Sequence, residues 1–139
     1  MLVEHARNVI GIADASHAEY RVPGTQIVTL LACSLRDNSI EIDLSPGTRL
    51  RALYRSQHGA STATAIERTT CSYGLEPAFA HIATAGGMVV SAVDGTGEVR
   101  AVERTDHPFF VATLYQPQLT SSPGAPHPIW TGFIRAVLG

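Results

Sequence analysis

Hydrophobic and polar residues alternate along the chain in a way that predicts short strands between a helix at each end. Apolar side chains three and four positions apart predict a first helix over residues 1–11 and a last one after Pro128, which suits a first helical turn. A third helix is expected over residues 77–85, ended by Gly86-Gly87. We predict strands over residues 26–35, 40–44, 48–54, 88–93, 99–104 and 109–115.

The strand predicted over residues 109–115 is a run of seven apolar or β-favouring residues. It has no polar alternation beyond Thr113, and such a run is typical of a strand that is buried on both faces. Gln116-Pro117-Gln118 ends it. A residue just past such a strand lies at the rim of an α/β sheet, where active sites are usually found. The pattern therefore predicts an α/β fold with a candidate site near Gln116 and Gln118.

Length and charge narrow the class of protein. A chain of 139 residues suits one domain, here taken as residues 1–139, and its net charge of −2 argues against a nucleic-acid partner. Charged residues make up 16%, below the roughly 25% of soluble domains, which favours an oligomer or a larger assembly. No apolar run approaches the ~20 residues that span a bilayer, and the first residues do not resemble a signal peptide, so we expect a cytoplasmic protein.

Cysteine and histidine give little sign of a metal or cofactor site. The two cysteines, Cys33 and Cys71, are too few for a disulfide framework and are expected as free thiols, with Cys33 in the core. The six histidines are scattered along the sequence. We therefore predict no bound metal and no cofactor.

Three stretches together resemble a known family. They are residues 1–12, the segment Glu67-Arg68 to Tyr73, and residues 97–118 with their Gln-Pro-Gln ending. They resemble the class I glutamine amidotransferase domain at the C-terminus of CTP synthase, and most of all the stand-alone CTP-synthase-like proteins. The resemblance implies the C-terminal portion of a flavodoxin-like domain. The short strands predicted over residues 26–35, 40–44 and 48–54 suggest a small antiparallel β excursion beside the main sheet. Residues 1–12 resemble the helix after the nucleophile turn, so we expect either a late-starting reading frame or a natural remnant.

The resemblance also implies that two groups of the family's catalytic triad are replaced. The family strand ends in His-Pro-Glu, where the His is the general base for a Cys and the Glu orients it. Gln116 and Gln118 stand at those two positions, and a carboxamide neither takes up a proton at neutral pH nor holds an imidazolium. Thr69-Thr70-Cys71-Ser72 replaces a core whose Arg grips glutamine, which removes a contact worth about 1.5–3 kcal/mol.

These replacements leave a short set of candidate site residues. Gln116 and Gln118 are the first pocket candidates, because amides both donate and accept hydrogen bonds, with drift without a ligand as the alternative. The further pocket candidates are Ser72, Tyr73 and Tyr115. Cys71 and Glu67 are the catalytic candidates, although a thiol needs a nearby cation to become reactive and Arg68 is expected on the opposite face. The remaining polar residues have structural interpretations: a solvated loop acid for Glu19, a turn for His107 and a helix start for His127.

Three functions follow from these residues. The first is an amidotransferase-like domain of pyrimidine metabolism that no longer hydrolyses glutamine, a pseudoenzyme that acts as a binding or interaction module. The second is an enzyme of different chemistry in the former pocket. The third is a glutaminase completed by an upstream segment or a partner chain. We also expect a homo-oligomer or a partner chain to cover an open sheet edge, and a small polar ligand.

Overall fold

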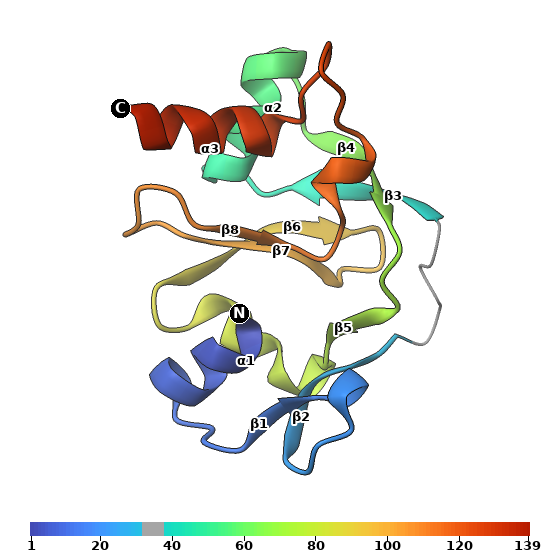
Figure 1. Ribbon diagram of the computed structural model, residues 1–139, viewed down its shortest axis with the longest axis vertical. Coiled ribbons are helices and arrows are strands. Elements are labelled where there is room, and N and C mark those ends of the chain that lie inside the picture. Colours follow the sequence, from blue (N-terminus) through green and yellow to red (C-terminus); the bar gives the residue numbers. More distant parts are fainter. Residues whose placement is uncertain (32–37) are drawn as a thin grey trace.

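The structure, a computed structural model, describes residues 1–31 and 38–139 of the chain. Its middle layer is an antiparallel sheet with the strand order β4-β3-β6-β7-β8 (Figure 1). A smaller sheet pairs β1 with β2 in parallel and β2 with β5 in antiparallel. The strands are β1 Ala15–His17, β2 Thr25–Leu30, β3 Asn38–Leu44, β4 Thr64–Thr69, β5 Tyr73–Leu75, β6 Met88–Asp94, β7 Val99–Arg104 and β8 Val111–Thr113.

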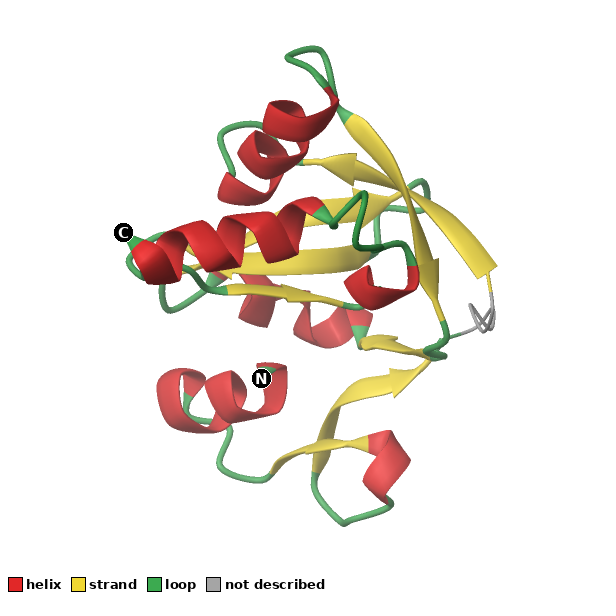
Figure 2. Cartoon of the chain, turned by 45° about the horizontal axis from the view of Figure 1, so that its top comes forward, coloured by secondary structure: helices red, strands yellow, loops and turns green. Residues whose placement is uncertain are grey.

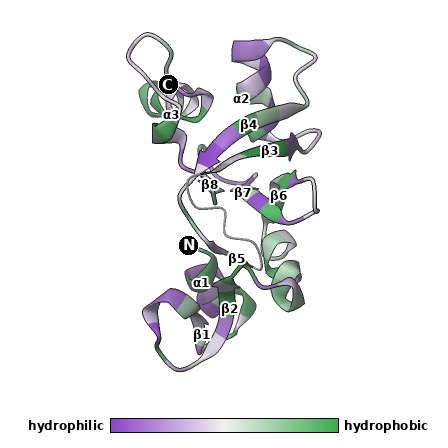
Figure 3. Cartoon of the chain, turned by 90° about the vertical axis from the view of Figure 1, so that its right-hand side faces the viewer, coloured by the Kyte–Doolittle hydropathy of each residue, from purple (hydrophilic) through white to green (hydrophobic). Residues whose placement is uncertain are grey.

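Helices cover both faces of the five-stranded sheet (Figure 2). Helices α2 and α3 lie on one side, and α1 lies on the other side with the smaller sheet (Figure 3). The helical segments are α1 Leu2–His5, its π-helical continuation Ala6–Ile10, α2 Arg49–His58 and α3 Pro128–Leu138, with 3₁₀ turns at Ala18–Tyr20, Pro77–Thr84 and Pro117–Leu119. The helices predicted over residues 1–11, 77–85 and after Pro128 are therefore confirmed, the middle one in 3₁₀ form.

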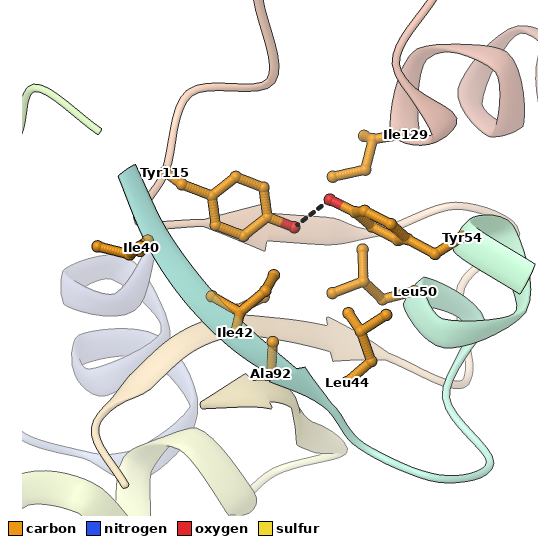
Figure 4. Packing of buried hydrophobic residues seen from close by; sticks show 9 residues of the cluster. Ile40, Ile42, Leu44, Leu50, Tyr54, Ala92, Tyr115 and Ile129 are labelled. Carbon is orange, nitrogen blue, oxygen red and sulfur yellow. Dashed lines mark hydrogen bonds between the residues drawn. The ribbon is translucent and has the colours of Figure 1, made fainter. Parts of the chain in front are cut away.

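The core lies in separate apolar layers on the two sides of the sheet. Above the sheet, Ile42, Leu50 and Ile129 pack in a cluster beneath α2 and α3 (Figure 4). Below it, Met88 and Val102 pack against the 3₁₀ turn Pro77–Thr84 and against α1. A further cluster joins α1 to the smaller sheet. Strand β7 supplies both layers, with Ala101 above and Val102 below, which is the arrangement expected of a sheet covered on both faces.

The strand predicted over residues 48–54 is wrong, because this segment begins helix α2. Thr48 is its N-cap, and the Thr48 Oγ1 atom accepts a hydrogen bond from the Arg51 backbone N–H at 3.3 Å. The buried Glu103 carboxylate of β7 accepts from the two N–H groups that begin the helix, those of Arg49 at 2.8 Å and Leu50 at 2.9 Å. A distant strand thus completes the cap of this helix.

The smaller differences from the predicted elements also concern pairing between distant segments. No strand was predicted over residues 12–25, but this segment contains β1. The strand predicted over residues 40–44 was expected beside the main sheet, and the structure pairs it into that sheet as β3, next to β4, where no strand was predicted. Cys33 lies outside the described residues. Strands β3, β6 and β7 lie where the alternation predicts them.

The burial predicted for residues 109–115 is only half right. Val111 packs against the apolar layer under α2 and α3, and Ala112 packs against the opposite layer, so both faces are covered. However, β8 is only Val111–Thr113, its residues are half-buried, and it is the terminal strand of the sheet order. Apolar residues signal covered faces, but they carry no information about whether the strand's edge is paired.

Gly24 closes the loop between β1 and β2 at a position where alanine is expected to destabilise the fold. Its φ of +137° disfavours L-residues, and a Cβ there would overlap the Asp14 carbonyl oxygen. That oxygen also accepts the Thr25 backbone N–H at 3.0 Å. We expect Gly24→Ala to lower the free energy of unfolding by about 2–3 kcal/mol, measured by urea denaturation. Gly95, which has open space around it and no positive φ, is the control, and an equal effect of Gly95→Ala would contradict this account.

Candidate functional site

Gln116 and Gln118 lie in different surroundings just after β8. Gln116 is hydrogen-bonded to the end of β4 and to the residue that follows it. Its backbone N–H donates to the Arg68 carbonyl at 3.0 Å, and its side-chain Oε1 accepts from the Thr70 N–H at 2.8 Å. Gln118 is exposed in the 3₁₀ turn Pro117–Leu119 and lines a hollow of about 480 Å³. Phe109, Trp130 and Phe133 form apolar walls of this hollow. The Gln116 oxygen therefore stabilises the β4 end, and Gln118 faces an apolar surface.

Cys71, Ser72 and Tyr73 continue the chain beyond β4 and stay close to Gln116 through Thr70. The Cys71 thiol points toward the Tyr73 carbonyl oxygen, with 3.8 Å between sulfur and oxygen. In this contact the thiol is a weak hydrogen-bond donor to a carbonyl oxygen. The Tyr73 ring packs against the His17 ring with 5.0 Å between centroids. The Ser72 carbonyl accepts the Leu31 backbone N–H at 2.8 Å. The structure thus brings Cys71 and Gln116 into one region.

Glu67 instead belongs to a buried polar cluster of Tyr54, Glu67, Tyr115 and His127. Tyr54, Glu67 and His127 are 2%, 3% and 4% exposed. The Tyr54 hydroxyl donates to Glu67 Oε1 at 2.6 Å, and His127 Nε2 lies 3.0 Å from the same oxygen. The hydroxyls of Tyr54 and Tyr115 are 3.2 Å apart and point toward one another (Figure 4). Helix α2, strand β4, the segment after β8 and the start of α3 meet here.

The hydrogen-bond partners assign a direction to each proton in this buried polar cluster. His127 is the N-cap of α3, and its Nδ1 accepts the Ile129 backbone N–H at 3.2 Å. Nδ1 therefore carries no proton, and the neutral ring is assigned as the Nε2–H tautomer that donates to Glu67. Because the Tyr54 proton goes to Glu67, the Tyr115 hydroxyl must donate to the Tyr54 oxygen. The hydrogen bonds of the cluster are therefore directed at the Glu67 carboxylate, from Tyr54 and His127 directly and from Tyr115 through Tyr54.

The tyrosines of the buried polar cluster are held in the protonated form. Burial raises the pKa of Tyr54 far above its usual value of 10.0, and the neighbouring Tyr115 and Glu67 raise it further. Burial also raises the pKa of Tyr115, although its hydrogen bond with Tyr54 acts in the opposite direction. Charging either hydroxyl would place a second negative charge beside Glu67. Both phenols thus act as donors at neutral pH.

This cluster can hold the fold together more readily than it can perform acid–base chemistry. The polar atoms bond to one another, and Tyr54, Glu67 and His127 also line a pocket of about 690 Å³ together with His58 and Thr120. The sequence pointed to Glu67 as an acid but missed Tyr54, because its helix was interpreted as a strand. His127 was predicted as a helix-start residue, and its N-cap bond confirms this. His107 likewise makes its predicted turn bond, since its Nδ1 accepts the Phe109 N–H at 3.1 Å.

No metal-ligand cluster and no membrane-spanning helix lies within residues 1–31 and 38–139. Among these residues, no three His, Cys, Asp or Glu side chains are grouped so that they would hold a metal ion. In the same part of the chain, no helix combines the length and the apolar character needed to cross a bilayer. Glu19 is exposed, and its backbone N–H donates to His17 Nδ1 at 3.1 Å, in keeping with the solvated loop acid expected there.

The sequence is similar to those of CTP synthases from several organisms. The chain is 31% identical over 148 residues to CTP synthase of Archaeoglobus fulgidus, and 35% identical over 155 residues to that of Acidothermus cellulolyticus. Both alignments cover 99% of this chain but only 27% of the relative, so the chain spans about a quarter of the curated proteins it matches. No family model matches the sequence.

The structure is similar to a solved domain of CTPS. The glutaminase domain of CTPS from Trypanosoma brucei, solved with bound acivicin, matches 97% of this chain with a TM-score of 0.85 and 25% sequence identity. The match covers 55% of that chain. The expected class I glutamine amidotransferase fold is thereby confirmed. The chain is thus related in sequence to CTP synthase, and in structure to the glutaminase domain of CTPS.

Proposed function

We propose that this chain is a CTP-synthase-related amidotransferase-like domain that does not hydrolyse glutamine and acts as a binding or interaction module. The observation that carries the proposal is the pair Gln116 and Gln118, at the positions where the resembled family has a general base and the acid that orients it. An amide is neither, so the family reaction has no base from this strand. The Gln116 oxygen is moreover already bonded to the Thr70 N–H.

The neighbouring groups support the same proposal. Loss of the general base in a comparable triad lowers the rate by about 10⁶-fold. Cys71, the alternative nucleophile, directs its thiol at a carbonyl oxygen, and Glu67 is occupied by the buried donors Tyr54 and His127. An enzyme of different chemistry therefore gains no reactive group from these residues. The proposed setting is the cytoplasm and pyrimidine metabolism, since the curated relatives are CTP synthases.

Released ammonia tests the loss of glutamine hydrolysis. We expect the chain, incubated with glutamine at neutral pH, to release ammonia at no more than the rate of a buffer blank, because the base and its orienting acid are both replaced. The control is a CTP synthase glutaminase domain at the same concentration. Turnover on the order of 1 per second would overturn the proposal. Gln116→Ala and Cys71→Ser variants would then show which side chain supports the reaction.

A further inference from the structure

A pocket of about 690 Å³ opens beside the buried polar cluster, between the end of α2, strand β4 and the segment before α3. Small-molecule sites in proteins usually have volumes of about 300–1,000 Å³, so this pocket is large enough for a small ligand. Neither Gln116 nor Cys71 lines it. The pocket is therefore a site separate from the region that these two residues share.

Glu67 contributes to this pocket a buried carboxylate that lacks a cationic partner. The residue is 3% exposed, and His127, whose Nε2 lies 3.0 Å from its Oε1, is the neutral tautomer assigned above. Within residues 1–31 and 38–139, no arginine lies within ion-pair distance of Glu67, and the chain has no lysine. Because a buried charge is costly unless it is paired, a cation bound beside Glu67 would stabilise it.

The second carboxylate oxygen of Glu67, Oε2, is only weakly bonded on the side of the pocket. Tyr54 and His127 both bond to Oε1. The Thr120 hydroxyl lies 3.4 Å from Oε2, and the same hydroxyl lies 3.5 Å from the Pro117 carbonyl oxygen. One hydroxyl proton serves one of these acceptors at a time, and both distances are longer than those of good O–H···O bonds. Since Glu67 and Thr120 both line the pocket, an N–H group of a ligand can replace this weak bond.

The remaining walls of the pocket suit the rest of an organic cation. Ser61, Thr62 and Thr64 bring hydroxyl groups to the lining, and hydroxyl oxygens accept hydrogen bonds from further N–H groups. Ala65 and Pro126 add apolar surface for the carbon atoms of a ligand. Among the described residues of the lining there is no arginine, so an anionic ligand would meet the Glu67 charge without a guanidinium to offset it.

We infer that this pocket binds a small organic cation, whose amidinium or ammonium N–H groups donate to Glu67 Oε2 and whose carbon skeleton packs against Ala65 and Pro126. The inference rests on the binding role proposed above and deepens it, because it names a site and a class of ligand. Titration with a cation tests this site, whereas released ammonia tests the loss of glutamine hydrolysis. Either proposal can therefore fail alone.

Benzamidine is a suitable probe, because it joins a planar cationic amidinium to an apolar ring, and benzoate is an anion of nearly the same shape. The measurement follows the backbone amide NMR signals of the ¹⁵N-labelled 139-residue chain at neutral pH. We expect benzamidine to shift the Thr62, Thr64 and Thr120 amides saturably, with a dissociation constant on the order of 1 mM. Benzoate should bind at least about 10-fold more weakly. No saturable shift of these amides by benzamidine, shifts centred elsewhere, or equal binding of benzoate would overturn the inference.

A pair of glutamine variants locates the contact. Glu67→Gln keeps a carbonyl oxygen for Tyr54 and His127, but it removes the charge and places an amide N–H₂ donor at the position of Oε2. Glu41→Gln removes the same charge from the opposite face of the sheet, since Glu41 pairs with Ile66 and neighbouring residues alternate between faces. We expect Glu67→Gln to weaken benzamidine binding at least about 10-fold, and Glu41→Gln to change it by less than about twofold. Unchanged affinity in Glu67→Gln, or an equal loss in Glu41→Gln, would contradict the site. The comparison of benzamidine with benzoate uses the wild-type chain and does not depend on either variant folding.

Discussion

Replacing Glu67 by alanine is expected to lower the free energy of unfolding by about 3 kcal/mol. Glu67 Oε1 is the common acceptor for the Tyr54 hydroxyl and for His127 Nε2–H, both buried. Without it, two buried donors lose their partner, and each unsatisfied group costs about 1–3 kcal/mol. Urea denaturation followed by circular dichroism measures the change, with the m-value showing whether the unfolding transition itself is altered.

Two further variants separate the buried polar cluster from general effects of losing a carboxylate. Glu41, exposed on the neighbouring strand β3, is the matched control, and Glu41→Ala should change the free energy of unfolding by no more than about 0.5 kcal/mol. Thr120→Val removes only a weak bond, 3.4 Å from Glu67 Oε2, and should cost less than about 1 kcal/mol. Similar losses for Glu67→Ala and Glu41→Ala would show that the Glu67 carboxylate is not the centre of the cluster.

Alkaline pH is expected to destabilise the folded chain through Tyr54 and Tyr115. Both phenols have a pKa of 10.0 when exposed, and burial raises both in the folded state. Above pH 10 the folded chain therefore holds more protons than the unfolded chain, so rising pH favours unfolding. Each tyrosine contributes a slope of up to about 1.4 kcal/mol per pH unit, or about 2.8 kcal/mol for the two together.

The composition makes this alkaline slope easy to assign. The chain has ten arginines and no lysine, so no lysine side chain titrates between pH 10 and 11. The measurement is the free energy of unfolding at several pH values from 8 to 11. A variant with both Tyr54→Phe and Tyr115→Phe should start less stable at pH 8 and lose much less stability above pH 10. An unchanged slope in that variant would assign the alkaline transition to other groups.

Sequence patterns predicted those parts of the fold that depend on local residues. The alternation of Ile40, Ile42 and Leu44 gave β3, because one side of that strand is buried and the other is not. The apolar spacing of residues 1–11 gave α1 for the same reason. Local patterns failed for α2, where Thr48 to Tyr54 looks β-favouring but the Glu103 carboxylate, distant in sequence, caps the first turn.

The candidate site was predicted residue by residue, but its division into two regions was not. Glu67 was grouped with Cys71 because both lie in one short sequence segment, and with Gln116 because of the family resemblance. The Glu67 side chain, however, points into the core toward Tyr54 and His127, whereas Cys71 lies beyond the end of β4. Side chains of one strand alternate between its faces, and the partner on each face comes from elsewhere in the chain. Those partners cannot be deduced from a single sequence.

The cap of α2 by Glu103 has a consequence for how the chain folds. The two hydrogen bonds link positions that are separated by 54 and 53 residues in the sequence. The chain between them must therefore close into a loop before the helix gains its second cap. During synthesis, α2 leaves the ribosome well before β7, with only the Thr48 hydroxyl as its side-chain cap. A ten-residue helix is marginal by itself in water. Helix α2 therefore reaches its final stability only after β7 has been made and has paired, which places its completion late in folding.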